Sequence, residues 1–285
     1  MSLPWSPQSN LVPDVAGALP FLNKAIVRQR DAALNVEGGD VGGHGSPVLV
    51  ARHVCNYQAA VEVVRALGVP AGRMVDVGCG VGALAAWAAS ELGRDLVLCD
   101  QDAAVVRFGA ATFEVDAVTD LADAPTAAVV TAMEVLEHVP PQIQRSFVAG
   151  LWAKVESSGV LVLSTPDESS YPGGWSGYAP HVGVLNPGGL QALLIEVTGV
   201  EVQVVRLDGG PYEVPVLRRW LERILNGTWN GVQRTAPGLA TRLASRAGRA
   251  EPLDLDDLLP AATPVSVVPP SQGTGAGMLA IAQKP

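Results

Sequence analysis

The sequence predicts an α/β fold in which a mostly parallel sheet of seven strands carries helices on both faces. Short, continuous apolar runs alternate with longer segments of helical spacing, and this alternation is typical of strands that are buried on both faces. A glycine-rich stretch stands directly after the first clear run, where a strand would turn into a helix. The 285 residues, 48% of them hydrophobic, are enough for one large core with appended segments.

The expected strands begin at residue 73 and continue to the end of the chain. Their ranges are 73–78, 95–100, 113–121, 126–133, 159–166, 199–207 and 277–285. Helices are expected between them, most clearly over 81–93 and 141–157, because apolar residues recur there at helical spacing. Two further helices are expected ahead of the sheet, over 21–34 and 46–69, the second with Ser46 as its cap.

These patterns divide the chain into four parts. We expect an N-terminal helical cap over 1–70, the core of the sheet over 71–206, a helical insert over 207–275 and the last core strand over 276–285. Within the cap, the glycine-rich stretch 38–45 is expected to be a mobile loop, because glycine is costly to hold in one conformation.

The expected insert has an unusual charge. Residues 218–249 contain seven arginines and a single acid, Glu222, and residues 251–260 then reverse the sign. A solvated helical cap with a compensating acidic segment explains this composition, and a surface for an anionic substrate is the alternative.

The overall composition disfavours several classes of protein. A net charge of −9 and a pI of 4.9 argue against nucleic acid and anionic membrane surfaces as general partners. The sequence has no run of 18 apolar residues, so we expect no membrane span. The N-terminus lacks the pattern of a secretory signal. The three cysteines, Cys55, Cys79 and Cys99, form no C-x-x-C pair, which fits a reduced, cytoplasmic protein.

The glycine-rich turn reads "VDVGCGVG" and places Asp76 two residues before the first of three alternating glycines. This spacing differs from the G-x-G-x-x-G of dinucleotide sites. It closely resembles the first motif of the class I S-adenosylmethionine-dependent methyltransferases, and the resemblance covers roughly residues 45–206 and the last strand. It implies a Rossmann-like fold with S-adenosyl-L-methionine as the cofactor.

The same resemblance implies a set of cofactor contacts. Two glycines of the turn would pass close to the methionine moiety, and Asp100, at the end of the second strand, would accept the ribose hydroxyls. Asp116 would accept the adenine amino group, with Glu114 and Asp120 as its rivals. The full expected set is Asp76, Gly78, Cys79, Gly80, Gly82, Asp100, Gln101, Asp116 and Met133.

Residues 131–140, "TAMEVLEHVP", place three ionisable groups in an otherwise apolar run. We expect a helix to begin here, at the carboxyl end of the fourth strand, where open parallel sheets bind ligands. Glu134, Glu137 and His138 would then share one helical face. His181 follows the fifth strand, whose end faces the same cleft, so it would complete a set of four ligands for magnesium or manganese.

Two groups of methyltransferases resemble this pattern. The ubiquinone-biosynthesis O-methyltransferases read E-x-x-E-H-V here and carry a later histidine, and the small-RNA 2′-O-methyltransferases bind a metal through two glutamates and two histidines. Both act on an oxygen of a vicinal diol or catechol, which implies O-methylation assisted by a metal.

The residues themselves leave three roles open for the candidate catalytic pair, His138 and His181. Both histidines bind a metal, or one histidine acts as a base without a metal, or the group of glutamates and histidines is purely structural. His44 and His53 are expected to be surface or packing residues.

The resulting prediction is an enzyme of biosynthesis that transfers a methyl group to a hydroxyl of a small molecule. An RNA 2′-O-methyltransferase, which the arginine-rich insert would suit, and a non-catalytic, cofactor-binding regulator are the alternatives. The acidic chain favours the small molecule over RNA. The long loop after the fifth strand carries Tyr171, Trp175 and Tyr178, which would either cover the substrate or pack against the domain.

Overall fold

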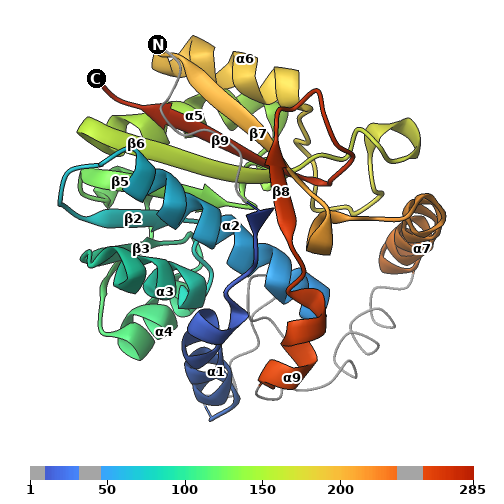
Figure 1. The fold of residues 1–285 in the computed structure, drawn as a ribbon, viewed down its shortest axis with the longest axis horizontal. Coiled ribbons are helices and arrows are strands. Elements are labelled where there is room, and N and C mark those ends of the chain that lie inside the picture. The colour runs from blue at the N-terminus through green and yellow to red at the C-terminus, as the bar shows by residue number, and fades with distance from the viewer. Residues whose placement is uncertain (1–9, 32–45, 236–252) are drawn as a thin grey trace.

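The computed structural model describes residues 10–31, 46–235 and 253–285, and it confirms the predicted α/β fold (Figure 1). The loop expected over 38–45, with His44, lies outside the described residues, as does part of the expected insert.

The described strands form one sheet. Their bounds are β1 Asn10–Leu11, β2 Met74–Val77, β3 Leu96–Cys99, β4 Asp116–Val118, β5 Ala127–Met133, β6 Val155–Pro166, β7 Val202–Asp208, β8 Val265–Val268 and β9 Gly277–Gln283. The order across the sheet is β1-β8-β7-β9-β6-β5-β2-β3-β4. The pairings make β8 and β9 run against the other strands, so the sheet is mostly parallel.

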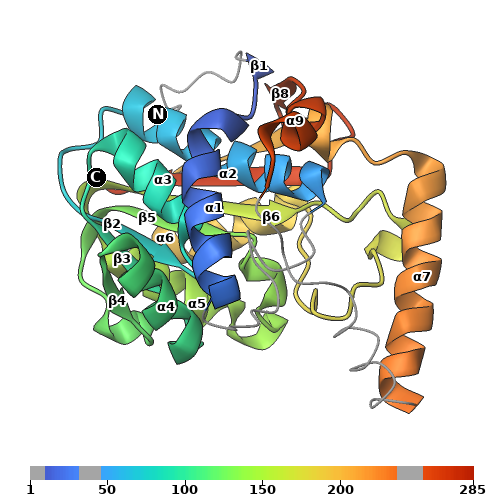
Figure 2. The ribbon, with the colours of Figure 1, turned by 90° about the horizontal axis from the view of Figure 1, so that it is seen from below.

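Helices cover both faces of this sheet (Figures 1 and 2). The helices are α1 Val15–Asp31, α2 Pro47–Ala66, α3 Ala83–Leu92, α4 Ala103–Phe113, α5 Pro141–Lys154, α6 Pro187–Thr198, α7 Val216–Thr235 and α9 Leu255–Leu258. Short 3-10 turns are η1 Leu121–Asp123, η2 Leu136–His138, η3 Pro172–Gly174, η4 Gly210–Tyr212 and η5 Leu259–Ala261. Side chains of α1 to α4 and of α9 enter the core on one face, and those of α5 and α6 enter the core on the other.

Alternation along the strands explains why the apolar runs in the sequence are continuous. In β2, Met74 belongs to the first core and Val75 to the second, and Val129 and Val130 of β5 divide in the same way. Each central strand therefore needs apolar side chains on both of its faces, as predicted.

The sheet is wider than the seven strands predicted, because β1 and β8 extend one edge. β1 consists of only two residues, and β8 lies between Pro264 and Pro269, where proline argues against a strand. The two strands pair with each other in antiparallel register.

The first helix also begins earlier than the expected residue 21. The Asp14 carboxylate accepts a hydrogen bond of 2.9 Å from the backbone N–H of Gly17 and so caps α1. Pro20 lies inside the helix, and a proline at this place hides the helical pattern in the sequence.

A buried acid joins three elements behind the glycine-rich turn. Asp76 of β2 is 0% exposed, and its carboxylate accepts hydrogen bonds from the Tyr57 hydroxyl of α2, at 2.9 Å, and the Thr131 hydroxyl of β5. A buried carboxylate is costly unless hydrogen bonds satisfy it, so these bonds fix α2 and β5 against β2.

Replacing Tyr57 by Phe should therefore destabilise the fold by ~1–3 kcal/mol, because the Asp76 carboxylate loses a buried partner. Urea unfolding measures this as a lower midpoint at constant m-value. Tyr178→Phe is the matched control, since the side chain of Tyr178 is 46% exposed, and it should change stability by less than ~0.5 kcal/mol. Equal stabilities of the two variants would contradict this role of Asp76.

Candidate active site

The glycine-rich turn adopts a backbone that requires glycine. Gly78, Gly80 and Gly82 have φ values of 72°, 55° and 74°, which other residues rarely adopt. A Cβ on Gly78 would lie 2.5 Å from the Val135 side chain. The turn after β2 therefore packs directly on the segment that follows β5.

Asp100 is the residue that the resemblance implies as the ribose acceptor. It directly follows β3, and its carboxylate accepts hydrogen bonds from the N–H groups of Gly80, at 3.0 Å, and Asp102, at 2.9 Å. The first bond holds this acid beside the glycine turn. Gln101, next to it, is exposed.

Asp116, the expected acceptor for the adenine amino group, stands at the start of a strand and not at its carboxyl end. Asp116 is the first residue of β4 and pairs with Val97, near the start of β3. It therefore lies toward the amino ends of the parallel strands, whereas the glycine turn lies at their carboxyl ends. The error came from the strand boundary, which is the least reliable part of a sequence prediction. Its rival Asp120 follows the carboxyl end of β4, where its carboxylate accepts a 2.8 Å hydrogen bond from Ala122 N–H.

Three other expected cofactor residues are buried. Asp76, Cys79 and Met133 are 0%, 3% and 6% exposed. Asp76 is bonded to Tyr57 and Thr131 directly ahead of the glycine turn, and it so helps to position that turn. Met133 ends β5 directly ahead of the acidic segment.

That segment is not the helix that the sequence suggested. Glu134 has a φ of 55°, and only a short 3-10 turn, η2, follows it. The Glu134 N–H donates to the Ser164 carbonyl and hydroxyl, both at 3.0 Å, so β6 fixes this unusual backbone. The prediction that Glu134, Glu137 and His138 share one helical face is therefore wrong.

Glu134 consequently turns toward α2. Its carboxylate accepts a hydrogen bond of 3.2 Å from Asn56 Nδ2 and lies 3.9 Å from the Arg52 guanidinium. It stands outside the compact group formed by the other expected metal ligands.

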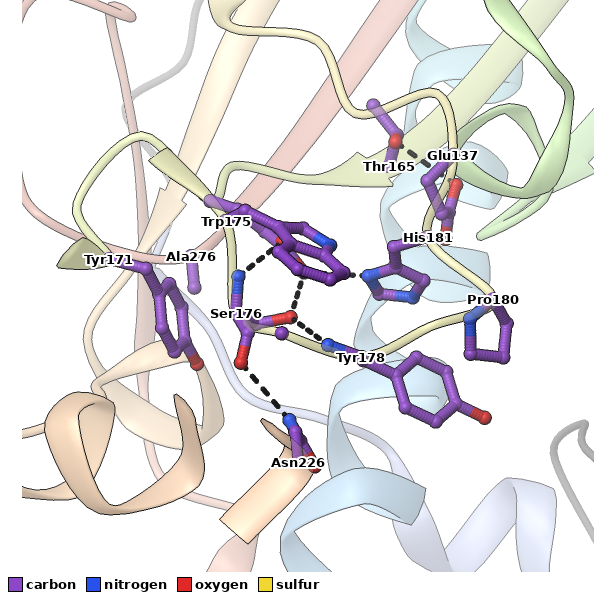
Figure 3. A network of polar contacts seen from close by, with 12 residues as sticks. Glu137, Thr165, Tyr171, Trp175, Ser176, Tyr178, Pro180, His181, Asn226 and Ala276 are labelled. Carbon is purple, nitrogen blue, oxygen red and sulfur yellow. Dashed lines mark hydrogen bonds and ion pairs between the residues drawn. The ribbon is translucent and has the colours of Figure 1, made fainter. Parts of the chain in front are cut away.

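Glu137, His138 and His181 do converge (Figure 3 shows the first and the last). Each offers one ligand atom within 4.8 Å of those of the other two, and the two imidazole rings lie 5.0 Å apart between centroids. Glu137 Oε1 lies 3.9 Å from His138 Nε2. Two segments separated by some forty residues in sequence thus meet at the carboxyl edge of the sheet.

Hydrogen bonds fix the orientation of both rings. His138 Nδ1 lies 3.1 Å from the Pro180 carbonyl, and His181 Nδ1 lies 2.6 Å from a carboxylate oxygen of Glu168. Both partners are acceptors, so each Nδ1 carries a proton, and in the neutral form of either ring the lone pair lies on Nε2. This arrangement is typical of histidines that bind a metal or take up a proton.

Burial governs the charges of the group. Burial and the nearby charge of Glu134 raise the pKa of Glu137 well above its usual value. Burial, together with repulsion from His181, lowers the pKa of His138. The pKa of Glu168 is lowered, because hydrogen bonds from His181 and Ser176 outweigh the opposing effect of burial.

Backbone and amide hydrogen bonds hold the two segments together. Gly183 N–H donates to the Glu137 carbonyl at 2.8 Å, and Gln144 Nε2 donates to the carbonyls of both Leu136 and Gly183. A Cβ on Gly183 would lie 2.1 Å from the Val139 carbonyl oxygen, so only glycine permits this approach.

Comparison with known proteins decides the family. A family described as a methyltransferase domain matches residues 51–221, which is more than half of the chain. The chain belongs to the S-adenosylmethionine-dependent methyltransferases.

Solved structures with the same fold include other methyltransferases. One is a putative sarcosine dimethylglycine methyltransferase from Galdieria sulphuraria, at 10% identity and a TM-score of 0.51, with 84% of this chain and 91% of that chain covered. Another is the plantazolicin methyltransferase BpumL, at 12% identity and a TM-score of 0.51, with 94% and 98% covered. No curated protein matches the sequence significantly.

Several residues of this methyltransferase site were missed in the sequence. Glu168, which holds His181, follows β6 in "STPDESS". An acid directly after the end of a strand could have indicated a site residue in the sequence. Gly183 and Gln144 carried no signal, because their role depends on contacts between distant segments. Arg52 was likewise hidden on the buried side of α2.

The remaining histidine and the cysteines take no part in the described cluster. Burial lowers the pKa of His53, which lies on α2. All three cysteines are buried thiols outside any disulfide, and burial raises the pKa of Cys55 to about 12, so it is an inert thiol at neutral pH. Within the described residues, no helix is long and apolar enough to cross a membrane.

Proposed function

We propose that this methyltransferase transfers the methyl group to a hydroxyl of a small molecule that carries two adjacent oxygens. The observation that supports it is the convergence of Glu137, His138 and His181, with both Nε2 atoms free, beside the glycine turn. S-adenosyl-L-methionine supplies an activated methyl on a sulfonium. The chain must hold the acceptor oxygen in line and manage its proton.

For the cofactor, we assign the turn backbone around Gly78 and Gly80 to the methionine moiety and Asp100 to the ribose. We assign the adenine amino group to Asp120 in place of Asp116, because Asp120 follows the carboxyl end of its strand.

Calorimetric titration with S-adenosylhomocysteine tests this choice. Asp120→Asn should weaken binding by ~3–10-fold, because the uncharged amide oxygen is a weaker acceptor for the adenine amino group than the carboxylate is. Asparagine can still cap η1, so the local fold is kept. Asp116→Asn is the matched control and should stay within ~2-fold of the unchanged protein. Weakening by Asp116→Asn alone would restore the original assignment.

A divalent metal fits the three converging residues. Glu137 is 1% exposed, and its Oε1 is buried with no hydrogen-bond partner, although a buried carboxylate oxygen normally has one. Its other oxygen accepts a 3.0 Å bond from the Thr165 hydroxyl. Glu137, His138 and His181 would hold the ion, and this donor set suits manganese better than magnesium.

When bound, such an ion would lower the pKa of a chelated hydroxyl. The chain's own part is orientation: Glu168 fixes the His181 ring, and the Pro180 carbonyl fixes His138. This fits the resemblance to the ubiquinone-biosynthesis and small-RNA enzymes, both of which act on vicinal oxygens.

A metal-free base is the second candidate mechanism. The side chain of His138 is 42% exposed, and burial of the remainder lowers its pKa, so the imidazole is neutral at pH 7. Its free Nε2 would then accept the hydroxyl proton directly.

The RNA alternative has less support from the described arginines. Arg219 and Arg223 donate to the carbonyls of Thr274 and Trp175, and Arg218 pairs with Glu222. A purely regulatory role does not explain why one oxygen of Glu137 is buried without a hydrogen-bond partner, because such an atom destabilises the fold.

Manganese titration separates the mechanisms. Glu137→Gln should weaken Mn²⁺ binding by at least ~10-fold, whereas Glu156→Gln, the matched control at the exposed start of β6, should stay within ~3-fold. Methyl transfer to a panel of catechols, followed by mass spectrometry, should stop on chelation and yield O-methyl products. Equal turnover with and without chelator would leave the metal-free base, and methyl groups on nitrogen or carbon would overturn the proposed function.

A further inference from the structure

α7 is a 20-residue helix at the periphery of the molecule (Figure 2). It packs against the loop between β6 and α6, which carries Glu168 and His181. The way in which it packs differs from that of an ordinary surface helix.

The polar side of α7 faces the protein. Asn226 Nδ2 donates to the Ser176 carbonyl at 3.1 Å, as Figure 3 shows, and Asn230 Nδ2 donates to the Gly177 carbonyl at 2.8 Å. One turn earlier, Arg223 donates to the Trp175 carbonyl, and Glu222 accepts from the Tyr171 hydroxyl. Residues spaced three and four apart therefore form one polar face against the loop.

The apolar side of α7 consequently faces outward. The side chains on it are at least half exposed: Val216 68%, Leu217 72%, Trp220 54%, Leu221 50%, Ile224 59% and Leu225 66%. An apolar ridge of this size on one helix marks an interaction surface, because single exposed apolar residues are the normal case. Nothing among the described residues covers it.

The charge of the segment indicates what covers this ridge. α7 itself carries four arginines against one acid, Glu222, in a chain whose net charge is −9. Pairing two copies of α7 would bring like charges together, so charge complementarity favours an anionic partner over a second copy. The surface is a convex ridge, which suits a deformable surface better than a rigid pocket.

We propose that α7 docks this protein on an anionic phospholipid surface, lying in the plane of the interface with the ridge from Val216 to Leu225 buried. A helix with a strongly apolar face, basic residues and low overall hydrophobicity is typical of such interfacial binding. Trp220 suits the boundary between headgroups and acyl chains. The acidic remainder of the chain disfavours anionic membranes in general, but this helix reverses the sign locally.

Docking would place the substrate side of the site at the membrane surface. α7 is hydrogen-bonded to the loop that carries Glu168 and His181, so docking of the helix would bring this loop close to the membrane. The proposal does not depend on which atom is methylated.

Flotation with vesicles tests this proposal on the full-length protein. Binding to equimolar phosphatidylcholine and phosphatidylglycerol vesicles should exceed binding to pure phosphatidylcholine and should fall with added salt. The double variant Leu217→Asp, Leu221→Asp should reduce the bound fraction by ~10-fold or more. The control double variant Ile143→Asp, Ile195→Asp on α5 and α6, where these side chains are 52% and 44% exposed, should leave it unchanged.

Two further measurements complete the test. Both variants should keep the melting temperature and the affinity for S-adenosylhomocysteine, because the substituted side chains are exposed. Absence of binding to the anionic vesicles, or binding that the double variant does not alter, would overturn the proposal. So would a dimer in light scattering that the double variant dissociates, without any vesicle binding. Failure of catechol methylation would not affect these outcomes.

Discussion

The site depends on the hydrogen bonds that hold the segment after β5 against the segment after β6. Gly183 N–H donates to the Glu137 carbonyl, and one amide, that of Gln144, serves both segments. Neither segment has a long helix or a strand ladder to fix it at this point, so these bonds replace regular secondary structure. The approach is so close that a side chain on Gly183 would collide with the Val139 carbonyl.

The chemistry follows from this junction. It brings His181 beside His138 and leaves one carboxylate oxygen of Glu137 buried and unpaired. Each imidazole donates its Nδ1 proton to a fixed acceptor, the Pro180 carbonyl or the Glu168 carboxylate, and so directs Nε2 to the other side of the ring. A group of ligand atoms prepared in this way costs little to reorganise when a metal or an acceptor proton arrives.

The sequence predicted the fold well, because buried strands and a glycine turn are local patterns. It also predicted that His181 would reach His138, since the carboxyl ends of parallel strands meet at one edge. It failed where one backbone angle decides the direction of a side chain: the positive φ of Glu134 turns its carboxylate away from the cluster. The assignment of Asp116 to adenine failed because a shift of a few residues in a strand boundary moves a side chain from the carboxyl end of the strand to its amino end. The outward apolar face of α7 was equally hidden, because helical periodicity does not say which face meets the protein.

The most direct test of this account is the tautomer of the two site histidines in the metal-free protein. A two-bond proton–nitrogen correlation spectrum of protein labelled with ¹⁵N-histidine distinguishes the tautomers, and His138→Gln and His181→Gln variants assign the signals. The account predicts that each ring, in its neutral form, carries the proton on Nδ1 and keeps Nε2 free. A neutral ring with its proton on Nε2 would contradict it, because that ring would then be unable to bind a metal or accept a proton toward the cleft.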